Sequence, residues 1–410
     1  MANLLYLVHR LPYPPNKGDK VRSFHLLKHL VARHRVFLGT FVDDAEDEPH
    51  VDTLRALCAG MHAVRLNPGL ARVASLSGLV DGSALTLRYY RDAGLRRWVE
   101  ETARRESIDA VIVFSSSMAQ YAEGLPSPTP LPMLVDFVDV DSAKWTEYAG
   151  HHRWPMSWLY RREGEQLLAY EREVAARSAR SFFVTAKEAE LFRALAPECS
   201  ARVEALGNGV DADYFQPDAT RASPFSPGET PLVFTGAMDY WPNIDAVSWF
   251  AKDMLPRLKA AWPGLRFHIV GRAPTPAVQA LANDDVVVTG TVPDVRPYLQ
   301  HAAVVVAPLR LARGIQNKVL EAMAMARPVV TATDCAGAIA SAQVPSELRS
   351  AAGADDYVQA VHAWLTDPAA ASAVGAAGRE RVLHDYSWPA QLAAIDRHLN
   401  ELGSARLAVA

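Results

Sequence analysis

The sequence predicts an α/β protein with two doubly wound domains that face each other across a central cleft. Short apolar runs alternate with longer helical patterns, which is typical of parallel sheets covered by helices. A polar, proline-dotted stretch at residues 216–231 interrupts this alternation, which then starts again. With 410 residues, half of them hydrophobic, the chain is long enough for two or three domains with cores of their own.

In the first half, apolar runs bounded by turn residues favour six buried strands. The expected strands are Leu4–Val8, Val36–Thr40, His62–Leu66, Ala110–Phe114, Leu134–Phe137 and Ser181–Val184. Helical periodicity lies between them. The expected helices are Val21–Ala32, Thr53–Ala59, Leu95–Arg105 and Ser157–Ala179.

The second half repeats this arrangement. The expected strands are Leu232–Thr235, Arg266–Val270, Val286–Thr289, Val304–Ala307 and Val329–Thr331, and the expected helices are Ile244–Ala261, Val319–Met325 and Asp356–Leu365. A last amphipathic helix, Trp388–Leu402, is expected to return to the first domain. We therefore predict domains at residues 1–206 and 207–387, with residues 388–410 as a helix packed on the first domain.

Composition excludes several classes of protein. A formal net charge of -4 argues against a nucleic-acid binder, which is usually strongly basic. The three cysteines, Cys58, Cys199 and Cys335, lie far apart without metal-ligand spacing, as expected for buried thiols of a cytosolic protein. No apolar run approaches the roughly 18 residues that cross a bilayer, and the N-terminal run resembles a strand rather than a signal peptide. The expected location is cytoplasmic.

The loop at residues 308–316 and the helix after it carry the clearest chemical signal. Ligands of open parallel sheets bind beyond the carboxyl ends of the strands. Gly314 lets the backbone come close to a ligand, and the helix start offers N–H groups to a diphosphate. Lys318 lies in the first turn, and Glu321, one turn later, can accept hydrogen bonds from a ribose. The alternative is a solvated Lys–Glu pair, but the apolar neighbours of these residues indicate a buried helix.

Three loops of the first half directly follow predicted strands and carry candidate site residues. Gly18 follows the first strand and allows a close backbone approach to phosphate. Asp139 and Asp141 allow three interpretations: a metal grip, a turn with a helix N-cap by Asp141 or Ser142, or an aspartate that orients or deprotonates an acceptor hydroxyl. The third is preferred, because the two-domain alternation does not fit a single-domain metal-dependent fold. The serines at 115–117 offer further hydrogen bonds.

Several segments resemble glycosyltransferase family 4. The residues are Lys318 to Val330, Gly207-Asn208-Gly209-Val210-Asp211 with Phe215, Ile269-Val270-Gly271, Gly290–Val292 and Tyr386-Ser387-Trp388. The segments 14–22, 136–145 and 312–318 resemble, more closely, the sugar transferases encoded with bacterial exosortase/PEP-CTERM exopolysaccharide systems. The resemblance implies the GT-B architecture, with an acceptor domain followed by a nucleotide-sugar domain. It also implies a metal-independent hexosyltransferase that retains anomeric configuration and needs no cofactor beyond its nucleotide-sugar substrate.

The resemblance also assigns roles to residues. Glu321 would hold the ribose, Lys318 the diphosphate, and backbone near Val292 the base. Family members often carry two glutamates separated by seven residues, and the first would fall at Arg313, which suits phosphate rather than sugar hydroxyls. The expected donor-binding residues are Gly18, Gly236, Arg272, Val292, Arg313, Gly314, Ile315, Gln316, Asn317, Lys318 and Glu321. The expected catalytic residues are Asp139, Asp141 and Lys318.

The expected partners are a nucleotide-sugar donor and a glycan or polyprenyl-diphosphate-linked acceptor. Aromatic and cationic residues mix at 151–162, which suits either peripheral contact with the inner face of the cytoplasmic membrane or an ordinary loop. Two alternative functions stay open: a nucleotide-sugar epimerase of the same architecture and a non-catalytic nucleotide-sugar-binding scaffold. A dinucleotide oxidoreductase is disfavoured, because no G-x-G-x-x-G follows a predicted strand.

Overall fold

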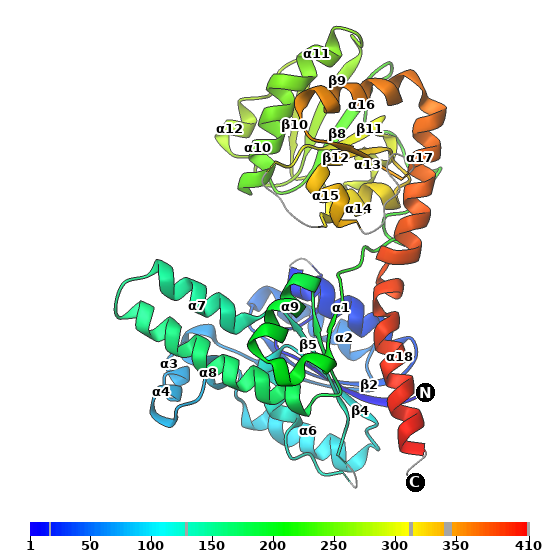
Figure 1. Cartoon of the computed structure of the whole chain (residues 1–410). Coiled ribbons are helices and arrows are strands. Elements are labelled where there is room, and N and C mark those ends of the chain that lie inside the picture. Colours follow the sequence, from blue (N-terminus) through cyan, green and yellow to red (C-terminus); the bar gives the residue numbers. More distant parts are fainter. Residues whose placement is uncertain (16–17, 128–129, 311–314, 340–346, 408–410) are drawn as a thin grey trace. The chain divides into compact units, whose positions relative to one another are not determined.

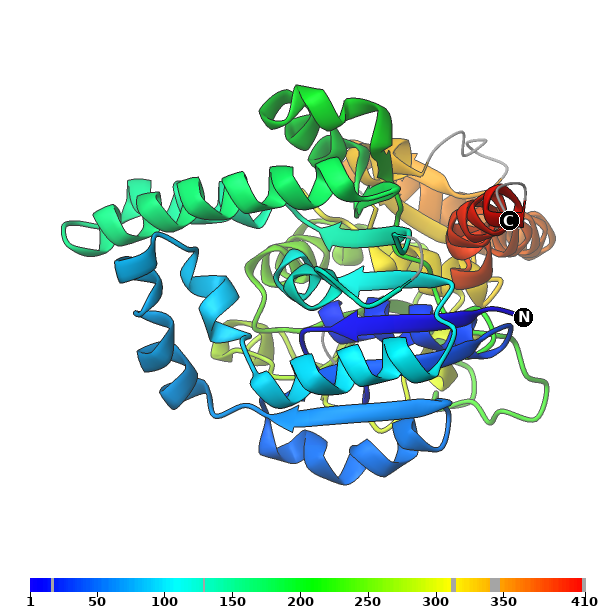
Figure 2. The same ribbon diagram turned by 90° about the horizontal axis from the view of Figure 1, so that it is seen from below.

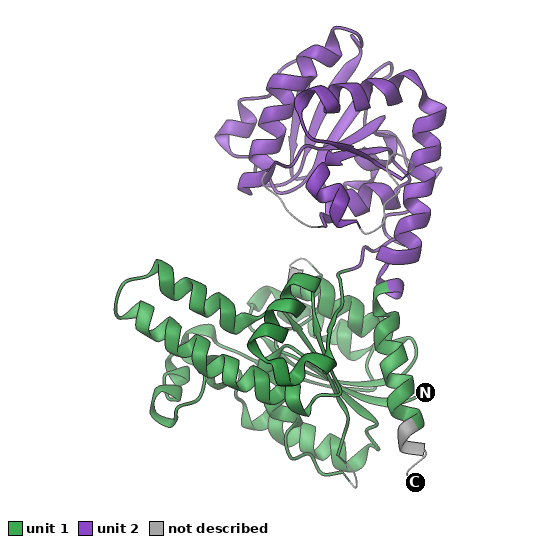
Figure 3. Ribbon diagram, viewed as in Figure 1, with its two compact units in different colours: residues 1–208, 391–410 green, residues 209–390 purple. Residues whose placement is uncertain are grey.

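The computed structural model describes residues 1–15, 18–127, 130–310, 315–339 and 347–407. The chain divides into two compact units, each built around one parallel sheet (Figures 1 and 3). The first unit contains residues 1–208 and 391–410, and the second contains residues 209–390. The chain is therefore an α/β protein with two Rossmann-like units.

The first sheet has seven parallel strands in the order β3-β2-β1-β4-β5-β6-β7. They are β1 (Asn3–Val8), β2 (Arg35–Val42), β3 (Gly60–Arg65), β4 (Ala110–Phe114), β5 (Met133–Val138), β6 (Arg180–Phe183) and β7 (Val203–Ala205). The order reverses between β1 and β4, which is the switch point where open α/β sheets bind ligands.

Helices cover both faces of this sheet. They are α1 (Gly18–Val31), α2 (Val51–Arg55), α3 (Pro68–Ser75), α4 (Gly78–Asp81), α5 (Leu85–Tyr89), α6 (Ala93–Arg105), α7 (Asp141–His151), α8 (Met156–Arg177) and α9 (Ala186–Leu195). Alternation along β1 shows the two faces: Tyr6 donates a hydrogen bond to Ser23 O of α1, whereas Leu5 and Leu7 join the core that contains Leu95 of α6. Helices α7 and α8 form a hairpin (Figure 2).

The last helix, α18 (Trp388–Leu407), joins the first unit from residue 391 onward. His29 Nε2 lies 2.9 Å from Asp396 Oδ1, and His398 Nε2 lies 3.0 Å from Glu204 Oε2. These contacts attach the C-terminal helix to α1 and to β7.

The second sheet has six parallel strands in the order β10-β9-β8-β11-β12-β13, with its switch point between β8 and β11. The strands are β8 (Thr230–Thr235), β9 (Leu265–Val270), β10 (Val286–Gly290), β11 (Val304–Ala307), β12 (Val329–Ala332) and β13 (Arg349–Ala351). The helices are α10 (Trp241–Trp249), α11 (Leu255–Lys259), α12 (Pro276–Gln279), α13 (Arg296–His301), α14 (Asn317–Ala324), α15 (Thr333–Ala338), α16 (Ala354–Thr366) and α17 (Pro368–Arg381).

The structure differs from the sequence prediction at several elements, and helices such as α3, α9 and α17 were not among those expected. The single helix expected over Ile244–Ala261 is interrupted by a π-helical turn at Phe250–Met254, because Pro256 lacks the N–H that an uninterrupted helix needs. Strands β7 and β13 were not predicted, since three residues give no readable alternation. The expected linker at 216–231 ends earlier than predicted, since β8 begins at Thr230.

Candidate functional site

A pocket of about 500 Å³ lies at the carboxyl end of the second sheet, beside its switch point. The ends of β8 and β9, the segment after β10, and the first turns of α10 and α14 line it. Six of the predicted donor-binding residues line this pocket: Gly236, Arg272, Val292, Asn317, Lys318 and Glu321. The fold therefore brings together residues that lie up to 85 positions apart, from Gly236 to Glu321 (321 − 236).

Two glycines form part of the pocket wall where β8 and β9 end. A Cβ atom on Gly271 would lie 1.7 Å from Gly236 O, which no side chain permits. A Cβ atom on Gly236 would lie 2.9 Å from Lys318 Nζ and 2.7 Å from Asn243 Nδ2. Both positions also have positive φ, 156° at Gly236 and 154° at Gly271, which glycine adopts most readily. Glycine at 236 therefore leaves room for the Lys318 ammonium group, and glycine at 271 allows the close backbone approach to Gly236.

Lys318 is held in a fixed position inside the pocket. Its Nζ donates a 2.5 Å hydrogen bond to Asn243 Oδ1 and lies 4.1 Å from the centre of the Phe234 ring. Asn243 Nδ2 donates in turn to Ala237 O at 2.8 Å, which fixes the orientation of the amide. Burial lowers the pKa of Lys318 to about 8, although Glu321 favours the charged form. An anion that enters the pocket would stabilise the charged form of this ammonium group, because it replaces part of the lost hydration.

Glu321 lies one turn after Lys318 on the same helix. Burial raises the pKa of its carboxyl group to about 7, and the charge of Lys318 opposes this rise. Within the part of the chain that the structure describes, no residue donates a hydrogen bond to this carboxylate. Its two oxygens are therefore available to ligand hydroxyls, since an ionised carboxylate only accepts hydrogen bonds.

Two further predicted residues near this helix, Ile315 and Gln316, do not line the pocket. Ile315 is 42% exposed. Gln316 is the N-cap residue of α14. Arg313 and Gly314 lie outside the described residues.

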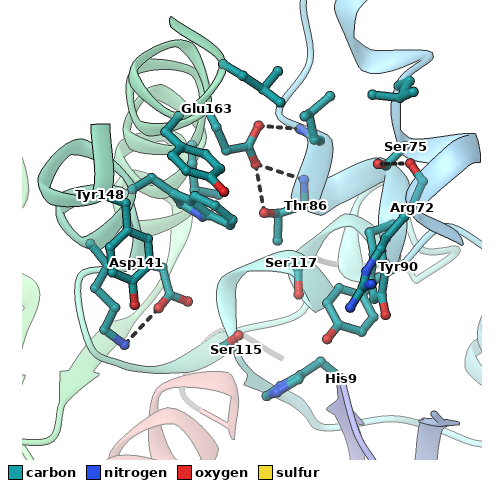
Figure 4. Close-up of a pocket in the computed structure, with 18 residues that line it drawn as sticks. His9, Arg72, Ser75, Thr86, Tyr90, Ser115, Ser117, Asp141, Tyr148 and Glu163 are labelled. Atoms are coloured by element: carbon teal, nitrogen blue, oxygen red, sulfur yellow. Dashed lines mark hydrogen bonds and ion pairs between the residues drawn. The ribbon is translucent and has the colours of Figure 1, made fainter. Parts of the chain in front are cut away.

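A second pocket, of about 600 Å³, lies in the first unit (Figure 4). His9, directly after β1, and Ser115 and Ser117, directly after β4, flank the switch point of the first sheet and line one end of this pocket. Helices α3 and α5 line one side, and α7 and α8 the other. Most of these wall residues are aromatic or aliphatic, so the pocket combines a polar end with apolar walls.

His9 was not among the predicted site residues, although its place just beyond a strand at a switch point marks it. Its ring stacks on Phe114 at 5.7 Å, and Nδ1 lies 3.3 Å from Phe114 O. Nε2 lies 3.8 Å from Asp19 Oδ2, and Asp19 also pairs with Arg10 at 2.8 Å. Burial opposes ionisation of Asp19, but the nearby His9 ring and the charge of Arg10 hold its pKa well below the usual range. Gly18, a predicted donor residue, begins α1 directly before Asp19.

Asp139 and Asp141 share one cation. Lys144 Nζ lies 2.7 Å from Asp139 Oδ2 and 3.1 Å from Asp141 Oδ1. Burial disfavours the charged lysine, but the two carboxylates outweigh it and raise the pKa of Lys144. Asp141 lines the first-unit pocket as the first residue of α7, and neither Asp141 nor Ser142 is the N-cap residue, which is Val140. Among the residues that the structure describes, no three His, Cys, Asp or Glu side chains are grouped to hold a metal ion.

Three segments quoted for the resemblance meet at a buried ion pair in the first unit. Arg22 contacts Asp136 through two bonds, of 2.7 Å from Nε and 3.0 Å from Nη2. Its Nη1 donates to Asn208 Oδ1 at 2.9 Å. Both partners of the pair are 2% exposed, so they fix how α1, β5 and the segment after β7 pack. Asp136 is therefore buried within β5 in a structural ion pair, whereas Asp139 and Asp141, which follow β5, pair with the exposed Lys144.

Two Rossmann-like units, each built on one parallel sheet, form the GT-B class of α/β fold. Residues 229–367 match the family model described as "Glycosyl transferases group 1", and this range contains the whole set of described residues that line the second-unit pocket. No curated protein matches the chain in sequence.

Solved structures of this fold resemble the chain over nearly its full length. The Anabaena protein HepE in complex with UDP has a TM-score of 0.63 at 13% identity, with 98% of this chain and 100% of that one covered. Sucrose-phosphate synthase from Thermosynechococcus elongatus has a TM-score of 0.61 at 18% identity, covering 99% and 100%. WaaG, a glycosyltransferase involved in lipopolysaccharide biosynthesis, has a TM-score of 0.57 at 15% identity, covering 96% and 98%.

Proposed function

We propose that this protein is a glycosyltransferase that moves a sugar from a nucleotide-sugar donor to a hydroxyl group of a glycan acceptor. The observation that carries the proposal is the pair Lys318 and Glu321 in the second-unit pocket. They are one cation and one carboxylate with hydrogen-bonding capacity left for a ligand. A cation at a helix start suits a diphosphate, and a carboxylate one turn later suits a ribose. The family model covers both residues, and HepE has been solved with UDP and with UDP-glucose.

The proposed reaction breaks the bond between the anomeric carbon of the sugar and the terminal phosphate oxygen of the donor. A glycosidic bond forms between the anomeric carbon and the acceptor oxygen, and the acceptor proton leaves with the nucleoside diphosphate. Negative charge grows on the departing phosphate, where Lys318 and the first N–H groups of α14 would stabilise it. Arg272, which lines the same pocket, adds a second cation. Retention of configuration and a hexosyl donor are part of the proposal.

For the acceptor side, the proposal assigns the pocket of the first unit. His9, Ser115 and Asp141 line it and offer the hydrogen-bonding groups that a sugar hydroxyl needs. The acceptor is a glycan, free or carried on a polyprenyl diphosphate, and the proposed setting is bacterial exopolysaccharide biosynthesis at the cytoplasmic face of the membrane. None of the described helices is both long and apolar enough to cross a bilayer.

The test begins with a thermal-shift screen of UDP, GDP, ADP and CMP conjugates, because a ligand that binds the folded state raises the melting temperature. The stabilising conjugate, labelled in its sugar, is then incubated with the protein and a glycan-lipid extract. Label transferred to an acceptor supports the proposal. Label that appears in an isomeric free nucleotide-sugar identifies an epimerase, and binding without turnover identifies a scaffold.

A further inference from the structure

The first unit carries an unusual helix pair at its surface, α3 and α4. The buried positions of α3 are Ala71 and Ser75, whereas its larger apolar side chains face outward. Leu70 is 70% exposed, and Val80 at the end of α4 is 91% exposed. Val73, Leu76 and Leu79 are exposed as well. An amphipathic helix that folds to bury its apolar side would show the reverse pattern, so this apolar face is free to meet something outside the unit.

A second exposed apolar group lies at the tip of the α7–α8 hairpin. Trp154, in the turn between the two helices, is 80% exposed, and Tyr148, Met156 and Trp158 beside it are exposed too. This is the segment whose composition suited a membrane interface. Figures 1 and 2 both show α3 and α4 beside this hairpin.

Hydrogen bonds from α8 fix the two groups relative to each other. Arg162 Nη2 donates to Gly78 O of α4 at 2.6 Å, and its Nη1 donates to Ser83 O at 3.2 Å. The neighbouring Glu163 is 1% exposed and accepts from the backbone N–H groups of Leu85 and Thr86 at 2.6 and 2.9 Å. The two apolar groups therefore belong to one rigid part of the unit. We call residues 66–80 and 148–162 together the apolar face.

Cations outnumber carboxylates on the apolar face and at its borders, where Asp81 at the end of α4 pairs with Arg88 and Glu147 precedes Tyr148. Residues 66–80 and 148–162 contain four arginines, Arg72, Arg153, Arg161 and Arg162, and no aspartate or glutamate. Arg72, Arg153 and Arg161 are exposed and form no ion pair with the residues that the structure describes. Exposed tryptophans among unpaired cations match the headgroup region of an anionic bilayer, where indole rings and arginines are both favoured. A protein partner with an apolar face would not require this excess of cations.

The apolar face also borders the pocket of the first unit. Arg72 from α3, Leu76 directly after it and Tyr148 from α7 line that pocket and belong to the apolar face as well. We propose that the apolar face docks on an anionic membrane surface, so that the pocket opens at the bilayer and receives an acceptor sugar carried on a lipid diphosphate. The choice of a lipid-carried acceptor rests on the proposed function, whereas the docking does not.

The test measures co-sedimentation of the full chain with phosphatidylcholine vesicles that contain either no or 30% phosphatidylglycerol. We expect binding to the anionic vesicles, and weaker binding in 0.5 M NaCl, because salt screens the arginines. The double variants Leu70→Ser/Val80→Ser and Trp154→Ser/Trp158→Ser should each lower the partition coefficient about tenfold or more, since each loses two large apolar side chains. Leu57→Ser and Leu383→Ser, at exposed leucines outside the apolar face, should bind like the wild type.

Nucleoside diphosphate binding by each variant, measured by calorimetry, separates the two proposals. Unchanged nucleotide affinity with lost vesicle binding supports the docking surface. Failure of the wild type to bind either vesicle, or equal binding by the double variants and the leucine controls, overturns it without touching the donor site. Self-association that only the double variants abolish, in the absence of vesicle binding, would instead assign the face to a second copy of the chain.

Discussion

Lys318 and Asn243, 75 positions apart in the chain, share a 2.5 Å hydrogen bond from ammonium to amide oxygen. The bond holds a half-buried cation beside the switch point of the second sheet without neutralising it. Replacing Asn243 by alanine should therefore weaken nucleoside diphosphate binding by about tenfold, as expected for the loss of one hydrogen bond to a charged group. Calorimetric titration measures this change. Asn400→Ala, at an exposed position of α18, serves as the matched control, and equal affinities of the two variants would contradict the role of Asn243.

Gly271→Ala should damage both stability and donor binding. The added Cβ would meet Gly236 O at 1.7 Å, so the ends of β8 and β9 must separate, and we expect a loss of about 2 kcal/mol or more in the free energy of unfolding. Urea denaturation measures this change. Gly337→Ala is the control, because nothing lies within 4 Å of its added Cβ. Similar unfolding curves for the two variants would show that the close backbone approach is not required.

The pH dependence of nucleotide binding should follow Lys318 and Glu321. Above a pH of about 8 the lysine loses the proton that attracts a diphosphate, and below about 7 Glu321 gains a proton and accepts hydroxyl hydrogen bonds less well. Affinity should therefore be highest between these values. Calorimetry from pH 5.5 to 9.5 measures the profile. Glu321→Gln should remove the acidic limb alone, and an unchanged acidic limb would exclude Glu321 as its source.

Glu171 should make the first unit less stable as the pH rises. Its carboxylate is 0% exposed and accepts from Ser142 Oγ at 2.5 Å, and burial raises its pKa to about 8. The folded state thus holds this proton more tightly than the unfolded chain, so the stabilisation is complete below about 4.5 and is lost as the pH rises through about 8. Glu171→Gln should flatten the fall in melting temperature between pH 5 and 8.5. In the wild type this fall corresponds to a loss of up to a few kcal/mol in the free energy of unfolding. Glu190→Gln, on the exposed side of α9, should keep the wild-type slope; a Glu171→Gln slope equal to it would contradict this assignment.

The sequence was sufficient for the central strands of both sheets and for the position of α14, but not for the short edge strands β7 and β13. Apolar runs such as Ala110–Phe114 and Val304–Ala307 are buried strands with the expected bounds, because a strand covered on both faces is apolar throughout. Lys318 and Glu321 were recognisable because charges within a buried helix need partners or a ligand.

Other parts of the site give no signal through their residue type. Asn243 and His9 are ordinary polar residues in the sequence, and their roles depend on partners such as Lys318, Asp19 and Phe114, which only the sheet topology brings near. The outward apolar side of α3 contradicts the usual pattern, since Leu70 and Val73 look like core residues until the fold shows which side faces the sheet.

The most direct test of the central claim is a calorimetric titration of the wild type, Lys318→Ala and Glu321→Ala with the nucleotide-sugar found in the screen, followed by turnover assays. The account predicts one site per chain in the wild type, and about tenfold or greater losses of turnover in each variant with unchanged melting curves. Wild-type affinity and near-normal turnover in both variants would contradict the assignment of the second-unit pocket as the donor site.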